Sequence, residues 1–335
     1  MKVDFHVRLE EGPYTLQWLQ RTTDSLQARL GEEAYGSRAW AEALARRLAE
    51  RIGRGPYNRE WLDLYRERAK QLEIKVVGVV EHLYRFVEFR DLYARHLQLG
   101  SDRFGFAQRR WLEQVSCESL SAYLSLMEEE RMRWAEDGIA LRVGIALDYF
   151  PGGEDELAAV IREHPWDFCL GHVRFVCGWG LHLPEIRERF WHMEPGRAYS
   201  CYFDLVEQAI ESRLFDLLAH VDGLGSYGGM SDSTSNLRYY QRIARALKRH
   251  DLAVEIDSLS ASSSYRKQSG SYALLEILAQ HGVAVTVSSG ACYPEQLGQH
   301  WEEACAVLKR AGIDAIAVFE QRVRQTVPLG GRSIG

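Results

Sequence analysis

The chain has 335 residues, with 41 basic and 47 acidic side chains and a formal net charge of −6. Hydrophobic residues make up 46% of it and charged residues 26%, a balance that excludes a disordered chain. No apolar run reaches the roughly 20 residues that a membrane-spanning helix needs, and the acidic balance argues against nucleic acid. We therefore expect a globular protein with neither a nucleic-acid nor a membrane partner.

The cysteines and the first residues indicate a compartment. Six cysteines are scattered along the chain without a C-x-x-C pair, and the first residues alternate apolar side chains with polar or charged ones. Such alternation is unlike a secretory signal peptide, which needs an apolar core of about 7–15 residues. The sequence predicts free thiols in a reducing environment and a cytoplasmic location.

Short β-branched runs alternate with amphipathic helical stretches along the chain. One predicted helix spans residues 58–72 with Asn58 as its N-cap, and Gly312 is the predicted C-terminal cap of the last helix. Seven strands are predicted, followed by a strand pair at Ala315–Leu329. The seven are Val3–Leu9, Ile74–Val80, Ala140–Phe150, Phe168–Val176, Leu217–Leu224, Ala253–Leu259 and Ala284–Ser289.

This alternation predicts an α/β fold, a parallel TIM-like barrel in a single domain over residues 1–335. An open doubly wound sheet remains the alternative, because periodicity does not show closure. Residues 15–73 and 84–138 exceed the minimal strand–helix repeat and are predicted helical insertions. The second insertion is rich in aromatic and arginine side chains, which suit either a lid or an oligomer contact.

Polar residues gather at the predicted C-terminal ends of the strands, where parallel barrels hold their functional residues. A lone histidine at such a place is more often a hydrogen-bonded structural residue than a ligand, whereas four on one rim indicate a site. Four of the eleven histidines fall there, namely His6, His82, His172 and His220. The other polar residues at these ends include Arg8, Asp148, Arg174, Asp222, Glu255, Asp257 and Cys292.

Seven short motifs, one for each predicted strand, occur in a fixed order. They are Asp4-Phe5-His6-Val7-Arg8, Val80-Glu81-His82, Gly144-Ile145-Ala146-Leu147-Asp148, Gly171-His172-Val173-Arg174, Ala219-His220-Val221-Asp222, Val254-Glu255-Ile256-Asp257 and Ser289-Gly290-Ala291-Cys292. In this order the motifs resemble those of the polymerase and histidinol phosphatase (PHP) family, in its histidinol-phosphatase-like branch. The resemblance covers nearly the whole chain.

The resemblance implies a distorted (β/α)7 barrel that binds up to three divalent metals and hydrolyses a phosphate ester with a metal-activated water. Three of the metal ligands that it implies are present, namely His6, His82 and His220. Five are replaced, and their positions hold Arg8, Ala146, Arg174, Gly290 and Cys292. The metal site of this chain therefore departs strongly from the family pattern.

Two of these replacements put a permanent positive charge where the resemblance implies a metal ligand. Arginine repels cations, whereas its planar fork suits phosphate and carboxylate groups. We therefore predict a metal-poor or metal-free pocket, without a full trinuclear cluster, that binds an anionic small molecule. Its candidate anion-binding residues are Arg8, His172, Arg174, Glu255 and Asp257, and its candidate catalytic residues are Asp148 and Asp222.

The alternative is an active, metal-dependent phosphomonoesterase with a reduced site. His6, His82 and His220 would bind one divalent metal, zinc, iron or manganese, and Cys292 is a candidate fourth ligand. Three histidines and a water form a known catalytic zinc arrangement. A buried structural thiol is an equally good interpretation of Cys292.

A third class of function is dinucleotide binding, because Gly223–Gly228 matches the pattern G-x-G-x-x-G after a predicted strand. In that motif the last glycine lies within the following helix, but the next predicted helix begins near Ser235. A loop at the barrel mouth is therefore the favoured interpretation.

Overall fold

The computed structural model describes residues 1–10, 12–27, 30, 35–191, 195–222, 233–258 and 271–329. Within these ranges no helix is both long enough and apolar enough to span a bilayer. All six cysteines fall within them and are free thiols. The predicted glycine motif at residues 223–228 lies outside the described residues.

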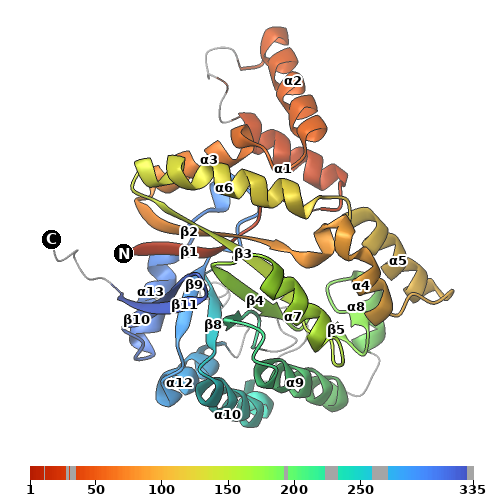
Figure 1. Cartoon of the computed structure of the whole chain (residues 1–335), viewed down its shortest axis with the longest axis vertical. Helices are drawn as coiled ribbons and strands as arrows, with labels where there is room; N and C mark the ends of the chain where they lie inside the picture. The colour runs from red at the N-terminus through yellow and green to blue at the C-terminus, as the bar shows by residue number, and fades with distance from the viewer. Residues whose placement is uncertain are drawn as a thin grey trace.

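Seven parallel strands form a nearly closed barrel (Figure 1). Their order in the sheet is β1, β2, β3, β4, β7, β8 and β9. The Arg8 amide, just after β1, donates to the Ala291 carbonyl beyond β9 at 2.8 Å and so joins the two outer strands. The predicted barrel is confirmed over the open sheet. The bounds are β1 Lys2–Val7, β2 Ile74–His82, β3 Ala140–Asp148, β4 Phe168–His172, β7 Leu217–Leu218, β8 Ala253–Asp257 and β9 Val285–Ser288.

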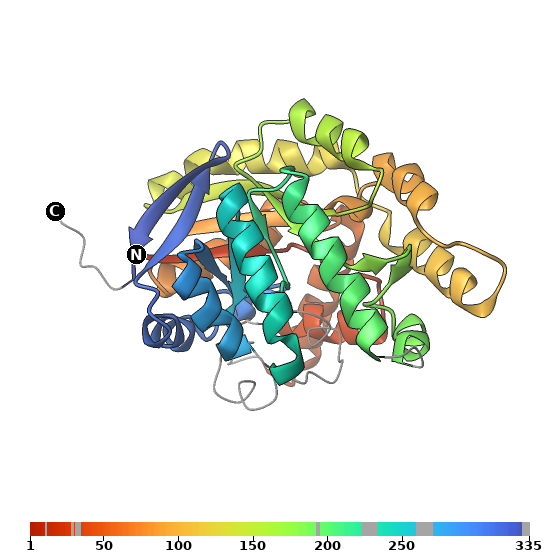
Figure 2. The same ribbon diagram turned by 90° about the horizontal axis from the view of Figure 1, so that it is seen from below.

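Helices surround the barrel on its outer side (Figures 1 and 2). Three of them, α9, α10 and α12, lie side by side, and α2 projects from the body. The bounds of the described helices are α1 Leu16–Gln27, α2 Arg38–Arg54, α3 Arg59–Gln71, α4 Arg90–His96, α5 Arg103–Val115, α6 Leu120–Glu136, α7 Glu154–Glu163, α8 Pro184–Trp191, α9 Pro195–Glu211, α10 Ser233–His250, α12 Ser271–His281 and α13 Trp301–Arg310.

Helix boundaries follow local sequence chemistry. The Asn58 side chain accepts from the Trp61 amide at 3.0 Å and caps α3, as the sequence predicts. At the other end of the chain, Gly312 follows α13 with a φ of 89°, a left-handed conformation that glycine adopts without strain. Within the described part of the chain, the connections also include three short 3₁₀ turns, η2 Leu83–Arg85, η3 Val87–Phe89 and η5 Pro294–Gln296. They include as well a small strand pair, β5 Phe175–Val176 with β6 Trp179–Gly180.

Aromatic rings fill the N-terminal end of the barrel. The Phe5 and Phe168 ring centroids lie 5.3 Å apart, and Phe319 packs on Phe5 at 5.8 Å. The Phe168 ring lies against Gly78 of β2 and Gly144 of β3, where any Cβ would overlap it. Because the described residues at this end are tightly packed, a ligand has more space at the opposite end of the strands.

The strand pair predicted at the end of the sequence is the antiparallel hairpin of β10 (Ala315–Glu320) and β11 (Val323–Pro328). Its turn crosses the start of β4, where the Gln321 amide donates to Asp167 at 3.1 Å. In the same turn the Arg322 guanidinium donates to both carboxylate oxygens of Asp216 and to the Leu214 carbonyl, at distances between 2.9 and 3.2 Å. The hairpin thereby closes the packed end of the barrel.

We predict that Asp216→Asn lowers the free energy of unfolding by about 1–3 kcal/mol, because the charge that anchors Arg322 is lost. Only 11% of the Asp216 side chain is exposed. Asp251→Asn is the matched control, since Asp251 pairs with Arg324 of the same hairpin but is 79% exposed. Urea unfolding measures both changes, and equal values for the two variants would contradict the anchoring role.

Candidate functional site

The four histidines at the strand ends meet at the open end of the barrel. The His172 ring centroid lies 5.7 Å from that of His6, 5.1 Å from that of His82 and 5.6 Å from that of His220. His6, His82 and His172 are buried, with 4% or less of each exposed. The strand ends thus place the other three imidazoles around that of His172.

Three of these histidines form a compact group of potential metal ligands. One ring nitrogen from each of His6, His82 and His172 lies within 4.8 Å of the others. Among the described residues, no hydrogen-bond partner is found for His6 Nε2 or for either ring nitrogen of His172. Buried nitrogens without partners are costly, and they are the atoms that a metal or a bound ligand would engage.

A carboxylate holds the ring of His6. His6 Nδ1 donates to Glu255 Oε1 at 2.7 Å, and the Ser288 hydroxyl donates to the same oxygen. Burial alone would raise the pKa of Glu255, but its contacts with His6 and Ser288 outweigh burial and lower that pKa to about 2. This hydrogen bond fixes the orientation of the His6 ring, so that Nε2 is the ring nitrogen not engaged by Glu255.

Arg174, just beyond β4, lies against the ring of His82. Its Nη2 atom is 3.1 Å from each ring nitrogen of His82, and its Nη1 atom donates to the Tyr84 hydroxyl at 2.9 Å. Its Nε atom is 3.6 Å from Asp148 Oδ1 at the end of β3. The Tyr93 hydroxyl donates to the other oxygen of Asp148 at 2.8 Å. The buried cation of Arg174 therefore lies within the histidine cluster, where Tyr84 and Asp148 hold it.

Burial and the charge of Arg174 favour the neutral forms of His82 and His172. Burial lowers the pKa of His82 well below its ordinary value, and the cation of Arg174 lowers it further. The same two causes, in the same order, lower the pKa of His172. Burial raises the pKa of Asp148 despite Arg174 and the Tyr93 hydroxyl, which act in the opposite direction. Neutral rings can accept hydrogen bonds or bind a metal, but they do not add positive charge.

The other arginine, Arg8, is held at the mouth by its backbone. Its amide donates to Ala291, and its carbonyl accepts from the Tyr65 hydroxyl at 3.1 Å. Its Nη1 atom lies 3.5 Å from His82 Nε2. Among the described residues, no carboxylate lies within 4 Å of the Arg8 guanidinium. The charge of Arg8 thus faces the site without a direct counter-charge.

The remaining predicted site residues lie around this cluster. His220 has a positive φ of 55°, and its carbonyl accepts from the Tyr202 hydroxyl at 2.5 Å. Cys292 is buried, but the group of three ligand nitrogens includes neither its sulfur nor His220. Asp257, at the end of β8, and Asp222, four residues beyond β7, are half-buried. The Asp222 carbonyl accepts from the Tyr240 hydroxyl.

Two tyrosines at the site were missed by the sequence interpretation. Tyr84 stacks on His82 with ring centroids 4.9 Å apart and follows it by two residues, a position from which it could have been identified. Tyr93 lies on α4, and nothing in the local sequence links it to Asp148. At the position of an implied carboxylate ligand, Ala146 lies beside His82 in the register of β2 and β3.

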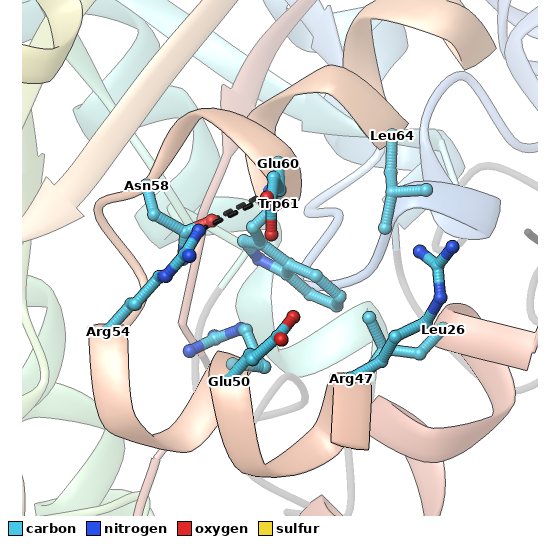
Figure 3. A pocket seen from close by; sticks show the side chains of 9 residues that line it. Leu26, Arg47, Glu50, Arg54, Asn58, Glu60, Trp61 and Leu64 are labelled. Carbon is cyan, nitrogen blue, oxygen red and sulfur yellow. Dashed lines mark hydrogen bonds and ion pairs between the residues drawn. The ribbon is translucent and has the colours of Figure 1, made fainter. Parts of the chain in front are cut away.

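A cavity of about 730 Å³ opens above the cluster. Arg8, Arg174 and His220 lie at its inner end, and Tyr84, Phe106 and Trp111 form one wall. By contrast, the hollow between α2 and α3 in Figure 3 measures about 30 Å³ and holds no more than a water molecule or two. Figure 3 shows Arg54 and Glu60 across that hollow, joined by an ion pair of 3.1 Å. The barrel mouth thus offers room for a small molecule.

Known proteins of similar sequence and structure share this barrel. No family model matches the chain. A protein of Deinococcus radiodurans named "Probable histidinol-phosphatase" is 23% identical over 206 residues, which are 61% of this chain and 78% of that protein. Histidinol phosphate phosphatase from Lactococcus lactis, solved with zinc, L-histidinol and phosphate, has a TM-score of 0.62 at 14% identity.

The Lactococcus similarity covers 78% of this chain and 92% of that structure. A second solved structure, from Listeria monocytogenes, has a TM-score of 0.57 at 15% identity and covers 72% of this chain and 92% of its own. The fold of the chain is thus that of a PHP-type barrel. The predicted resemblance to the histidinol-phosphatase-like branch of the PHP family is confirmed.

We predict that Tyr93→Phe lowers the free energy of unfolding by about 1–2 kcal/mol, because Asp148 is fully buried and loses a hydrogen-bond donor. Tyr149→Phe is the matched control, since Tyr149 also donates to a carboxylate, that of the half-buried Glu154. Denaturant unfolding of the two variants provides the comparison. If Tyr93→Phe lowers the free energy of unfolding by less than Tyr149→Phe does, Tyr93 does not stabilise the buried Asp148 that holds Arg174.

Proposed function

We propose that the barrel mouth binds a small molecule bearing a phosphate or carboxylate group, with Arg8 and Arg174 as the anion-binding residues. The observation that carries this proposal is the position of the Arg174 guanidinium, 3.1 Å from both ring nitrogens of His82. A cation thus stands beside a nitrogen that would otherwise be a metal ligand. The histidinol-phosphatase-like resemblance supports a phosphate-bearing ligand.

Electrostatics supports the absence of a full metal cluster. A divalent ion about 4 Å from a guanidinium is repelled by about 8 kcal/mol at an effective dielectric constant near 20. Arg8 adds a second cation, with its Nη1 atom 3.5 Å from His82 Nε2. Ala146, in register with His82, supplies no carboxylate to offset several dications. An anion, by contrast, gains from both arginines at once.

The chain's own residues prepare this anion site. Asp148 and the Tyr84 hydroxyl hold the Arg174 side chain in place, so little conformational entropy is lost when an anion binds. Guanidinium groups bind the oxygens of phosphate or carboxylate in pairs. The ring of His172 is buried and neutral, neither of its nitrogens has a partner among the described residues, and it can donate one hydrogen bond to the same anion.

Inorganic phosphate is the simplest test of the anion site. We expect phosphate to raise the melting temperature of the full chain, and Arg8→Gln or Arg174→Gln to weaken phosphate binding about tenfold, as titration calorimetry measures. Arg324→Gln, on the hairpin at the packed end of the barrel, is the control and keeps the affinity. Arg8 is half-exposed, so its variant keeps the test valid even where the Arg174 variant unfolds. Equal affinity in all four proteins would refute the proposal.

A second candidate function is a phosphomonoesterase with one metal. It is favoured by the unpartnered Nε2 of His6, whose Nδ1 is held by Glu255 as in carboxylate–histidine–metal sites. His6, His82 and His172 fit one metal, and among the described residues they are the group whose nitrogens lie close enough together. Bound there, a divalent ion supplies a Lewis acid and a water of lowered pKa. This ligand set replaces the predicted His220 and Cys292 with His172.

Zinc titration of chelator-treated protein tests this candidate. We expect no more than one equivalent of zinc to bind, and Glu255→Gln to weaken its binding about 10–100-fold through His6. His250→Ala, on the outer helix α10, serves as the control. Hydrolysis of para-nitrophenyl phosphate is expected only with zinc and is lost in His6→Ala. Binding of two or more equivalents of zinc would instead support a metal cluster. If no zinc binds, the zinc-dependent phosphomonoesterase is excluded.

A further inference from the structure

The cavity above the cluster carries positive charge at both of its ends. At the inner end lie Arg8 and Arg174, and on the outer wall lies Arg110, an exposed residue of α5. Among the described residues that line the cavity, Glu185 is the one carboxylate, and no ion pair joins Arg110 to it or to any other described acid. The second end of the cavity is therefore also suited to an anion.

An aromatic wall connects the two ends. Arg174 donates to the Tyr84 hydroxyl, and the Tyr84 ring centroid lies 4.9 Å from that of Trp111. Trp111 in turn packs on His182 at 4.5 Å. Because Trp111 follows Arg110 directly on α5, the wall runs from the buried arginine to the exposed one. Such a wall binds the apolar or planar body of a ligand.

His182 supports a ligand at this wall independently. Both of its ring nitrogens are buried, and neither has a hydrogen-bond partner among the described residues. Burial lowers its pKa well below the ordinary value, and the charges of Arg174 and Arg187 lower it further. A neutral imidazole in this position can bind an uncharged polar group in the middle of a ligand, but the arginines around it disfavour an ammonium group.

We propose that the ligand carries an anionic group at each end of an apolar or aromatic body, and that Arg110 binds the second anion. This inference rests on the proposed function, since the first anion is the one bound by Arg8 and Arg174. It specifies a class of ligand: phosphates that also bear a carboxylate or second phosphate, in preference to phosphates that bear an amine.

Four phosphonates that resist hydrolysis test the proposal by titration calorimetry on the full chain. Benzylphosphonate offers one anion, its para-carboxy and para-carboxymethyl derivatives offer two, and para-aminomethylbenzylphosphonate offers an anion and a cation. We expect the better of the two carboxylates to bind about fivefold more tightly than benzylphosphonate, and the amine to bind less tightly.

Arg110→Gln is expected to bring the ratio of the carboxylate and benzylphosphonate affinities close to one. Arg109→Gln is the matched control, because Arg109 is the neighbouring exposed arginine of α5, donates to the Leu99 carbonyl and does not line the cavity. This variant is expected to keep the ratio.

The outcomes separate the two proposals. If neither inorganic phosphate nor any phosphonate binds, the proposed function fails and this inference fails with it. If benzylphosphonate binds but neither carboxylate binds more tightly, or if the amine binds best, the second anion site is refuted while the first stands. A ratio unchanged by Arg110→Gln assigns the second anion to another residue and also refutes the inference.

Discussion

The Arg174 guanidinium reaches the centre of the barrel mouth because β3 and β4 lie side by side and end together. Asp148, at the end of β3, is in register with His172 of β4, so a residue two positions further along the chain can pair with its carboxylate. A buried guanidinium is costly without such partners, and Tyr84 and Tyr93 complete the set. This one placement adds to the effect of burial in lowering the pKa values of His82 and His172, and the proposed anion site depends on it.

The two ends of the barrel differ in composition: one is packed with aromatic rings, and the other holds the polar residues of the candidate site. At one end, Phe5, Phe168 and Phe319 fill the interior, and the turn of the β10–β11 hairpin is bound to the starts of β4 and β7. This packing requires no charged group inside the barrel. At the other end the interior holds buried imidazoles, the buried carboxylates of Asp148 and Glu255 and the buried guanidinium group of Arg174.

The sequence was sufficient to predict the seven strands, the Asn58 cap and the four histidines on one rim, because each of these depends on local pattern and on the parallel order of the strands. It could not predict that His172 groups more closely than His220 with His6 and His82, since this depends on side-chain direction beyond the strand ends. Long-range contacts such as His6 with Glu255 have no local signature either.

The hairpin that closes the packed end follows all seven barrel strands in the chain. During synthesis, Phe5 and Phe168 therefore leave the ribosome long before Phe319, the ring that packs on Phe5. Until then the nascent barrel is open to water at its most apolar end, and exposed phenylalanines are where an incomplete chain associates with others. The order of elements thus makes the whole growing chain dependent on its final hairpin for a sealed interior.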